Sequence, residues 1–253
     1  MKEKIKSFVK KFSEILFKYE CLLASRWASK AHEHLKWAQW RILPQPEFFD
    51  HHIDLYYQWL EKKDPLWTER GVFSGLALKG NNVLELACGD GFNARNFYSL
   101  KSKQIIACDF DPKAIRTAKN KNPASNVEYI LADIRSEMPQ GKFDNIIWDA
   151  AIEHFTPKEI NNILKEIKTR LNKEGILSGY TIVKKDDGQK SLSHHEYEFE
   201  NKEDLLNFLA PFFKNVTVFE TIFPSRHNLY FWASDESDLP FAKNWKHSIS
   251  HND

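Results

Sequence analysis

The feature that most constrains the fold is a short apolar run that leads directly into a glycine-containing turn. Residues 83–87 (Val-Leu-Glu-Leu-Ala) fit a buried strand, and Cys-Gly-Asp-Gly follows at 88–91, before a helical pattern begins. Glycines let the backbone of such a turn approach a ligand closely, and the first turn of a helix presents N–H groups that have no partner inside the helix. The run therefore predicts a strand–turn–helix unit with a ligand site at the turn.

Six further short apolar runs follow along the rest of the chain. Most of them are followed by a polar turn and a helical pattern, and strands that alternate with helices pair in parallel. We therefore expect an α/β fold with a doubly wound, mostly parallel seven-stranded sheet. The predicted strands are residues 82–87, 104–108, 127–131, 143–148, 176–183, 216–223 and 229–233.

The connections between the runs refine this expectation. Asp111-Pro112 and Thr156-Pro157-Lys158-Glu159 are typical helix starts, because a capping side chain precedes a proline at the first helical position. Only residues 224–228 separate the last two runs, which is too short for a parallel crossover. The sheet is therefore predicted to end in an antiparallel hairpin.

The N-terminal part of the chain carries a different surface from the rest. Residues 1–41 hold ten basic and four acidic residues, a net charge of +6, although the whole chain is only +1. Apolar residues between positions 5 and 23 follow one helical stripe. The pattern fits a helix docked on the domain, or an interfacial helix in which residues 1–25 contact anionic lipid at the inner membrane surface. We divide the chain into a Trp-rich helical extension or lid (1–79), a cofactor-binding domain (80–233) and a polar tail (234–253).

Composition argues against several classes of protein. With 36 basic and 35 acidic residues, the chain lacks the basic excess of a nucleic-acid binder, so we expect no nucleic-acid partner. The three cysteines are far apart and form no CxxC pair, which argues against a disulfide framework or a cysteine-based zinc site. No apolar run approaches the roughly 18 residues of a membrane-spanning helix, and no signal peptide is evident. The expectation is a cytoplasmic protein whose oligomeric state the sequence does not assign.

A carboxylate at the end of the second run indicates what the turn binds. Asp109 lies twenty positions after Gly89 and can accept hydrogen bonds from both hydroxyls of a ribose. Two kinds of nucleoside cofactor compete. Residues 89–94 (Gly-Asp-Gly-Phe-Asn-Ala) fit the G-x-G-x-x-A pattern of dinucleotide sites, but Glu85 and Asp90 place negative charge where a pyrophosphate would lie. A cofactor with an amino group and a sulfonium suits these acids better.

Over residues 80–233 the chain resembles the class I S-adenosylmethionine (SAM)-dependent methyltransferases. Residues 84–91 (Leu-Glu-Leu-Ala-Cys-Gly-Asp-Gly) are similar to the first motif of that family, with Ala87 where glycine is more usual. Residues 109–110 match its ribose and adenine contacts, residues 132–134 the motif that reaches the adenine amino group, and residues 149–155 the motif beside the reactive methyl. The resemblance implies a Rossmann-like methyltransferase fold with SAM held by Glu85, Ala87, Gly89, Gly91, Asp109, Phe110, Asp133, Ile134 and Asp149.

The resemblance also implies candidate groups on the acceptor side. His154 is the leading base for an acceptor hydroxyl, since imidazole titrates near neutral pH, although it could instead pack against or cap the next helix. Glu153 could orient the acceptor or serve as the base. The loop residues His194, His195 and Tyr197 are predicted to contact the acceptor, the alternative being a solvated loop. We expect no metal site, because two adjacent histidines do not by themselves converge on an ion.

Three functions are open at this level. The first is a SAM-dependent methyltransferase acting on oxygen or nitrogen of a small molecule such as a sugar, a glycan precursor or a secondary metabolite. The second keeps methyl transfer but takes a membrane-associated lipid as acceptor, because the chain begins with a basic amphipathic pattern. The third is a non-catalytic protein that binds SAM or a dinucleotide, for which Ala87 and the G-x-G-x-x-A match are the support.

Overall fold

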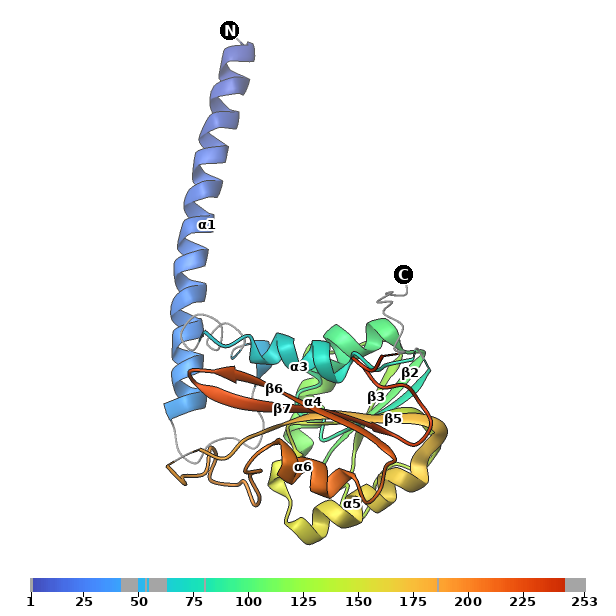
Figure 1. The fold of residues 1–253 in the computed structure, drawn as a ribbon. Helices are drawn as coiled ribbons and strands as arrows, with labels where there is room; N and C mark the ends of the chain where they lie inside the picture. The colour runs from blue at the N-terminus through green and yellow to red at the C-terminus, as the bar shows by residue number, and fades with distance from the viewer. Residues whose placement is uncertain are drawn as a thin grey trace. The chain divides into compact units, whose positions relative to one another are not determined.

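The computed structural model describes residues 2–41, 50–52, 54, 63–79, 81–185 and 187–243. The chain divides into two compact units, with the boundary between Pro46 and Glu47. The described part of the first unit is a single helix, α1 (Lys2–Arg41). The second unit contains the sheet that the sequence predicts (Figure 1).

Helix α1 extends well beyond the apolar stripe, between positions 5 and 23, from which the sequence predicted a helix. It runs for 40 residues, and the apolar side chains of the stripe from Phe8 to Leu23 are exposed, with Phe8 71% exposed. Within the described residues, no helix is both long enough and apolar enough to cross a lipid bilayer. The prediction of a helix at this end of the chain is confirmed.

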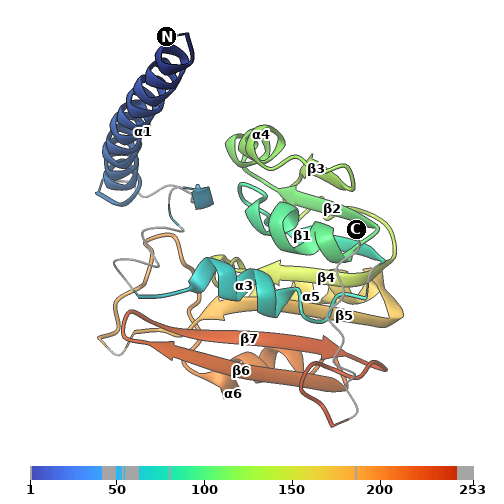
Figure 2. The same ribbon diagram turned by 90° about the horizontal axis from the view of Figure 1, so that it is seen from above.

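The second unit is built on one sheet with the strand order β3-β2-β1-β4-β5-β7-β6. The first five strands in this order pair in parallel, and β7 lies antiparallel between β5 and β6. The chain winds outward from β1 in both directions, so the predicted doubly wound seven-stranded fold is confirmed (Figure 2). The strands are β1 (Asn82–Leu86), β2 (Gln104–Asp109), β3 (Val127–Leu131), β4 (Phe143–Asp149), β5 (Leu171–Ile182), β6 (Asn215–Phe223) and β7 (Arg226–Ser234).

The predicted antiparallel hairpin at the end of the sheet is confirmed, and it is tighter than expected. Strand pairing between β6 and β7 continues to Phe223 and Arg226. The connection therefore consists of Pro224 and Ser225 alone, because the three residues that follow them join the strand.

Helices cover both faces of the sheet. They are α3 (Leu66–Ser74), α4 (Pro112–Lys121), α5 (Pro157–Arg170) and α6 (Lys202–Leu209), with shorter helical segments at Ala94–Tyr98, Ser99–Lys101 and Ile152–His154. Figure 1 shows α3 on one side of the sheet and α5 and α6 on the other. Alternation along β7 explains this arrangement. Tyr230 and Trp232 join the apolar cluster that contains α3, whereas Leu229 and Phe231 join the cluster that contains α5 and α6.

Both helix starts predicted from capping patterns are confirmed. The Asp111 side chain accepts a hydrogen bond from the Lys113 N–H at the start of α4. Thr156 and Glu159 form a reciprocal capping box at the start of α5. The first cap starts α4 directly after Asp109, at the end of β2. The second starts α5 directly after the short helical turn that follows β4.

The second unit begins earlier than the sequence suggested. The compact unit starts at residue 47, whereas the predicted extension reached residue 79. The difference arises because α3 buries Leu66 and Trp67 against side chains of β5 and β7. At the other end, Leu239 in the predicted tail is buried in the same cluster, and residues 244–253 lie outside the described residues.

Candidate active site

The turn that follows β1 has an unusual backbone. Ala87, Gly89 and Gly91 have positive φ angles of 54°, 55° and 73°. A Cβ atom at Gly91 would lie 2.6 Å from the Tyr129 ring, so glycine is required there. Ala87 adopts the left-handed region although it has a side chain, which costs about 1 kcal/mol. A turn held in this way keeps its backbone close to any ligand at the end of β1.

Asp109, at the end of β2, closes this turn. Its Oδ2 accepts a hydrogen bond from the Gly89 N–H at 2.9 Å, and its Oδ1 accepts one from the Asp111 N–H at 2.9 Å. The side chain is buried, and burial raises the pKa of its carboxyl. Because a carboxylate offers about four lone-pair sites, Asp109 keeps capacity for two ribose hydroxyls.

Glu85 is a buried acid within β1. Its Oε2 has no hydrogen-bond partner among the described residues. Burial, together with the neighbouring Asp149 carboxylate, raises the pKa of Glu85 well above its ordinary value. An unsatisfied acid at this depth fits a ligand that brings a hydrogen-bond donor or a positive charge.

The residues predicted to contact adenine lie at the ends of β2 and β3. Phe110 is 52% exposed, and Leu131 is exposed beside it on the neighbouring strand. Asp133 accepts hydrogen bonds from Arg135 at 2.7–3.0 Å, and this ion pair lowers the pKa of its carboxyl. Ile134 is buried. The strand ends thus present two exposed apolar side chains that a flat ring could cover.

Glu153 and His154 lie in the short helical turn (Ile152–His154) that follows β4. The Oε2 atom of Glu153 accepts a hydrogen bond from Thr181 Oγ1 at 3.0 Å. Its backbone carbonyl accepts two more, from the N–H groups of Glu196 at 2.8 Å and Tyr197 at 3.0 Å. This carbonyl therefore holds the loop after β5 against the turn after β4. Burial raises the pKa of the Glu153 carboxyl.

Three rings, those of His154, His194 and His195, form a histidine cluster at this contact. The His154 ring stacks on His194 with centroids 4.9 Å apart and meets His195 edge-on at 4.8 Å. Nδ1 of His195 lies 2.5 Å from Glu198 Oε1. Burial lowers the pKa of His195 to about 4, so its ring is neutral at pH 7. The structure thus brings Glu153 together with all three predicted histidines.

Tyr197, the remaining acceptor-side candidate, contacts different neighbours. Its hydroxyl lies 3.0 and 2.9 Å from the two carboxylate oxygens of Asp204 and donates to that group. Its ring packs on Phe199 and Phe208. Tyr197 therefore anchors the loop to α6 and does not join the histidine cluster.

Comparison with known proteins finds a methyltransferase-like domain in this part of the chain. A family model described as a methyltransferase domain matches residues 83–175. The fold also matches solved structures, among them the DhpI–SAM–HEP complex, with a TM-score of 0.55 at 15% identity over 72% of this chain and 91% of that one. A SAM-dependent methyltransferase from Clostridium acetobutylicum gives a TM-score of 0.54 at 14% identity over 72% of this chain and 97% of that one. Residues 83–175 match a methyltransferase domain, and the sheet that contains them has the fold of solved SAM-dependent methyltransferases.

Relatives of this methyltransferase domain carry names with different acceptors. A ribosomal protein L11 methyltransferase from Thermotoga petrophila is 27% identical over 50% of this chain and 47% of its own length. An (S)-coclaurine N-methyltransferase from Thalictrum flavum is 23% identical over 68% of this chain and 44% of its own length. The chain therefore spans less than half the length of these two relatives.

A buried ion pair joins α3 to the sheet of the methyltransferase domain. Arg70 Nε and Nη2 donate to Asp149 Oδ2 at 2.9 and 2.7 Å. Ser74 Oγ donates to Asp149 Oδ1 at 2.9 Å, and Asn93 Nδ2 donates to Oδ2 at 3.0 Å. Burial disfavours the charged guanidinium, but Asp149 outweighs this effect and raises the pKa of Arg70. These contacts hold Asp149 in place at the end of β4, and its predicted contact with SAM stays a prediction.

Asp90, within the turn after β1, is paired with a residue from an earlier segment. The His51 N–H donates to Asp90 Oδ2 at 2.9 Å, and His51 Nδ1 lies 2.7 Å from Oδ1. The His51 ring stacks on Phe92 at 5.1 Å. Burial opposes ionisation of Asp90, but His51 outweighs this and lowers the pKa of the carboxyl. Neither His51 nor Arg70 was predicted, because both meet partners far along the chain and no local pattern marks them.

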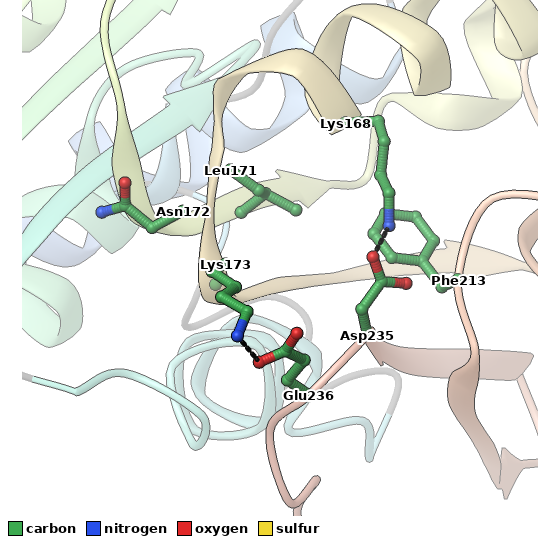
Figure 3. A pocket seen from close by; sticks show the side chains of 8 residues that line it. Lys168, Leu171, Asn172, Lys173, Phe213, Asp235 and Glu236 are labelled. Carbon is green, nitrogen blue, oxygen red and sulfur yellow. Dashed lines mark hydrogen bonds and ion pairs between the residues drawn. The ribbon is translucent and has the colours of Figure 1, made fainter.

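A pocket lies at the opposite end of β5 from the histidine cluster. It is lined by residues at the start of β5, including Leu171 and Gly175, and is bordered by Phe213 (Figure 3). Ion pairs between Lys168 and Asp235 and between Lys173 and Glu236 border it. None of the predicted site residues lines this pocket, so it is separate from the candidate active site.

Proposed function

We propose that this chain transfers a methyl group from SAM to an oxygen or nitrogen atom of a small-molecule acceptor. The observation that carries the proposal is Asp109, buried at the end of β2 and hydrogen-bonded to the Gly89 amide while it retains acceptor capacity. Bound SAM supplies a sulfonium methyl that is already activated for in-line transfer. The protein then has to hold the cofactor, align the acceptor and exclude water.

The residues around the turn fit the charge of SAM better than that of a dinucleotide. Asp109 can accept hydrogen bonds from the ribose hydroxyls, and Phe110 offers an exposed ring face to the adenine. Asp90, whose pKa is lowered by its contact with His51, is ionised within the turn and disfavours a pyrophosphate there, and the unpartnered Glu85 carboxyl can pair with an amino group of the cofactor. The G-x-G-x-x-A pattern at 89–94 is shared with dinucleotide sites, which makes NAD the direct competitor to test.

Glu153 and His154 supply groups for the acceptor side. They follow β4, and Asp109 ends β2, so all three lie at the edge of the sheet where the parallel strands end. In this proposal His154 takes the proton of an acceptor hydroxyl and Glu153 orients the acceptor. Glu153 and His195 are each 3% exposed, which favours an acceptor group small enough to enter between the turn and the loop. A sugar, a glycan precursor or a secondary metabolite meets this requirement.

A second candidate acceptor is a membrane-associated lipid. Helix α1 exposes Phe8, Phe12 and Leu16, and residues 1–41 carry ten basic and four acidic residues. A helix with these properties can lie in the interface of an anionic bilayer. The intact chain should then sediment with phosphatidylglycerol vesicles and not with phosphatidylcholine vesicles, and Phe12→Ser with Leu16→Ser should release it. An intact chain that never sediments with anionic vesicles would remove this candidate.

Calorimetric titration with SAM, S-adenosylhomocysteine and NAD tests the proposed cofactor. We expect the first two to bind and NAD not to bind. Asp109→Ala should abolish SAM binding, whereas Asp187→Ala, in an exposed loop, should leave it unchanged. Binding of NAD alone would overturn the proposal. SAM binding without release of S-adenosylhomocysteine, across a screen of sugars, lipid-linked precursors, amines and proteins, would favour a non-catalytic SAM-binding protein.

A further inference from the structure

We propose that Glu153, His154 and His195 bind a divalent transition-metal ion on the acceptor side of the methyltransferase domain. One potential ligand atom from each of these residues lies within 4.8 Å of those from the other two. Across the described ranges, these residues make the only group of three histidine, cysteine or acidic side chains with such spacing. The sequence predicted no metal site because His194 and His195 do not converge by themselves. The other two proposed ligands, Glu153 and His154, come from the turn after β4.

Backbone hydrogen bonds build this arrangement independently of any ion. The Glu153 carbonyl accepts from the N–H groups of Glu196 and Tyr197, which fixes the loop after β5 one residue away from His195. The His195 N–H also donates to the Leu192 carbonyl at 3.2 Å. The three side chains therefore lie on two segments that are already joined, so little reorganisation is needed to bind an ion.

Each of two proposed ligands is oriented by a further polar contact. Glu198 Oε1 lies 2.5 Å from Nδ1 of His195, so Nε2 is the nitrogen left to face an ion. Glu198 Oε1 also accepts from the Ser191 N–H at 2.7 Å, which fixes the carboxylate itself. Thr181 Oγ1 holds Oε2 of Glu153 and leaves Oε1 for coordination. Carboxylate–histidine pairs of this kind are characteristic supports of metal ligands.

The ligand set indicates which ions would bind. Two imidazoles and one carboxylate suit Zn²⁺, Fe²⁺ or Mn²⁺, whereas Mg²⁺ and Ca²⁺ prefer ligand sets made of oxygen. Three protein ligands leave one or more coordination positions open, as in catalytic sites. Those positions would take water or an oxygen atom of the acceptor.

The proposed ion has a consequence for the acceptor, and this part rests on the proposed function. A hydroxyl bound to the ion loses its proton to water more readily, because the cation stabilises the alkoxide. The alkoxide oxygen then forms a bond to the methyl carbon while the carbon–sulfur bond of SAM breaks, giving a methyl ether and neutral S-adenosylhomocysteine. The acceptor would be an oxygen-containing ligand, such as one with vicinal hydroxyls, and His154 would act as a metal ligand in place of a base.

Zinc and magnesium titrations of the tag-free full chain, stripped with a chelator and free of SAM, test the site. We expect Zn²⁺ to bind at about one ion per chain and Mg²⁺ to bind far more weakly. Glu198→Gln should weaken zinc binding by about 10–100-fold, and His195→Ala and the near-isosteric Glu153→Gln by at least as much. His227→Ala is the matched control, because His227 is also paired with a carboxylate, that of Glu220, but lies outside the cluster.

The outcomes separate the metal site from the methyltransferase function. Circular dichroism and SAM titration on the same samples report whether each variant is folded. Failure of the wild-type chain to bind Zn²⁺, or equal zinc affinity in all the variants, would overturn the metal site and leave SAM binding untouched. Zinc binding that depends on Glu153 and His195 in a chain that binds no SAM would support the site and overturn the proposed function instead.

Discussion

Replacing Arg70 by methionine tests whether the ion pair between α3 and β4 stabilises the methyltransferase domain. Methionine keeps much of the aliphatic volume of the arginine side chain and removes the guanidinium, whose central carbon lies 4.6 Å from the centroid of the Trp67 ring and 5.1 Å from that of Tyr180. The Asp149 carboxylate, whose side chain is 3% exposed, would then lie buried near Glu85 without its cation.

The contacts of Asp149 set the size of the effect. Removing one partner of a buried ion pair costs about 3–5 kcal/mol of unfolding free energy. Ser74 and Asn93 would still donate to Asp149, so we expect a loss of about 3–4 kcal/mol, in the lower part of that range. In a domain of this size each kcal/mol lowers Tm by about 2–4 °C, so the melting temperature should fall by roughly 6–16 °C.

Arg135→Met is the matched control for this measurement. Arg135 holds Asp133 through a similar two-nitrogen contact, but its side chain is 50% exposed, so the loss should stay within about 1 kcal/mol. Urea denaturation and thermal melting give both values. Adding Asp149→Asn to Arg70→Met should recover stability, because the second change removes the uncompensated charge. If Arg70→Met proved no more destabilising than Arg135→Met, the argument from burial would be refuted.

Three further changes test the candidate site. Gly91→Ala should lower Tm and abolish SAM binding, because a Cβ would lie 2.6 Å from the Tyr129 ring; normal melting and binding would contradict the close packing. Because burial raises the pKa of Asp109, its carboxyl takes up a proton at higher pH than a free aspartate. On acidification, SAM affinity measured by calorimetry should therefore begin to fall at a higher pH than a free aspartate would give. The residual SAM affinity of Asp109→Asn should not change over the same pH range. His154→Ala should lower turnover and leave SAM affinity intact, and unchanged turnover would remove His154 from the acceptor side.

The fold was predictable because the information for it is local. The seven apolar runs are continuous, and all seven became strands. Their limits lie within three residues of the predicted ones, except that β5 begins five residues earlier, at Leu171. Asp111 and the Thr156–Glu159 pair mark the starts of their helices through hydrogen bonds between residues no more than three positions apart. Even the hairpin followed from a length argument, since no parallel crossover fits between β6 and β7.

The interior of the candidate site was less predictable because it depends on distant partners. Arg70 and Asp149 are 79 positions apart, and His51 and Asp90 are 39 positions apart. The sequence marked His194 and His195 as candidates, but it did not show that a backbone carbonyl after β4 would hold their loop. His51 and Arg70 also lie in the segment that the sequence analysis assigned to the N-terminal extension. No strand–helix pattern in that segment indicated a place in the fold.

The positions of His51 and Arg70 in the chain also bear on how the domain is made. Both precede β1, so both leave the ribosome before Asp90 and Asp149, the two acids with which they pair. The segment before β1 thus supplies the polar partners of these two acids before the acids themselves are synthesised. A fragment that starts at β1 would contain every motif of the family and yet have to bury these two acids without these partners. An expression fragment of the methyltransferase domain should therefore begin at residue 47 and not at residue 80.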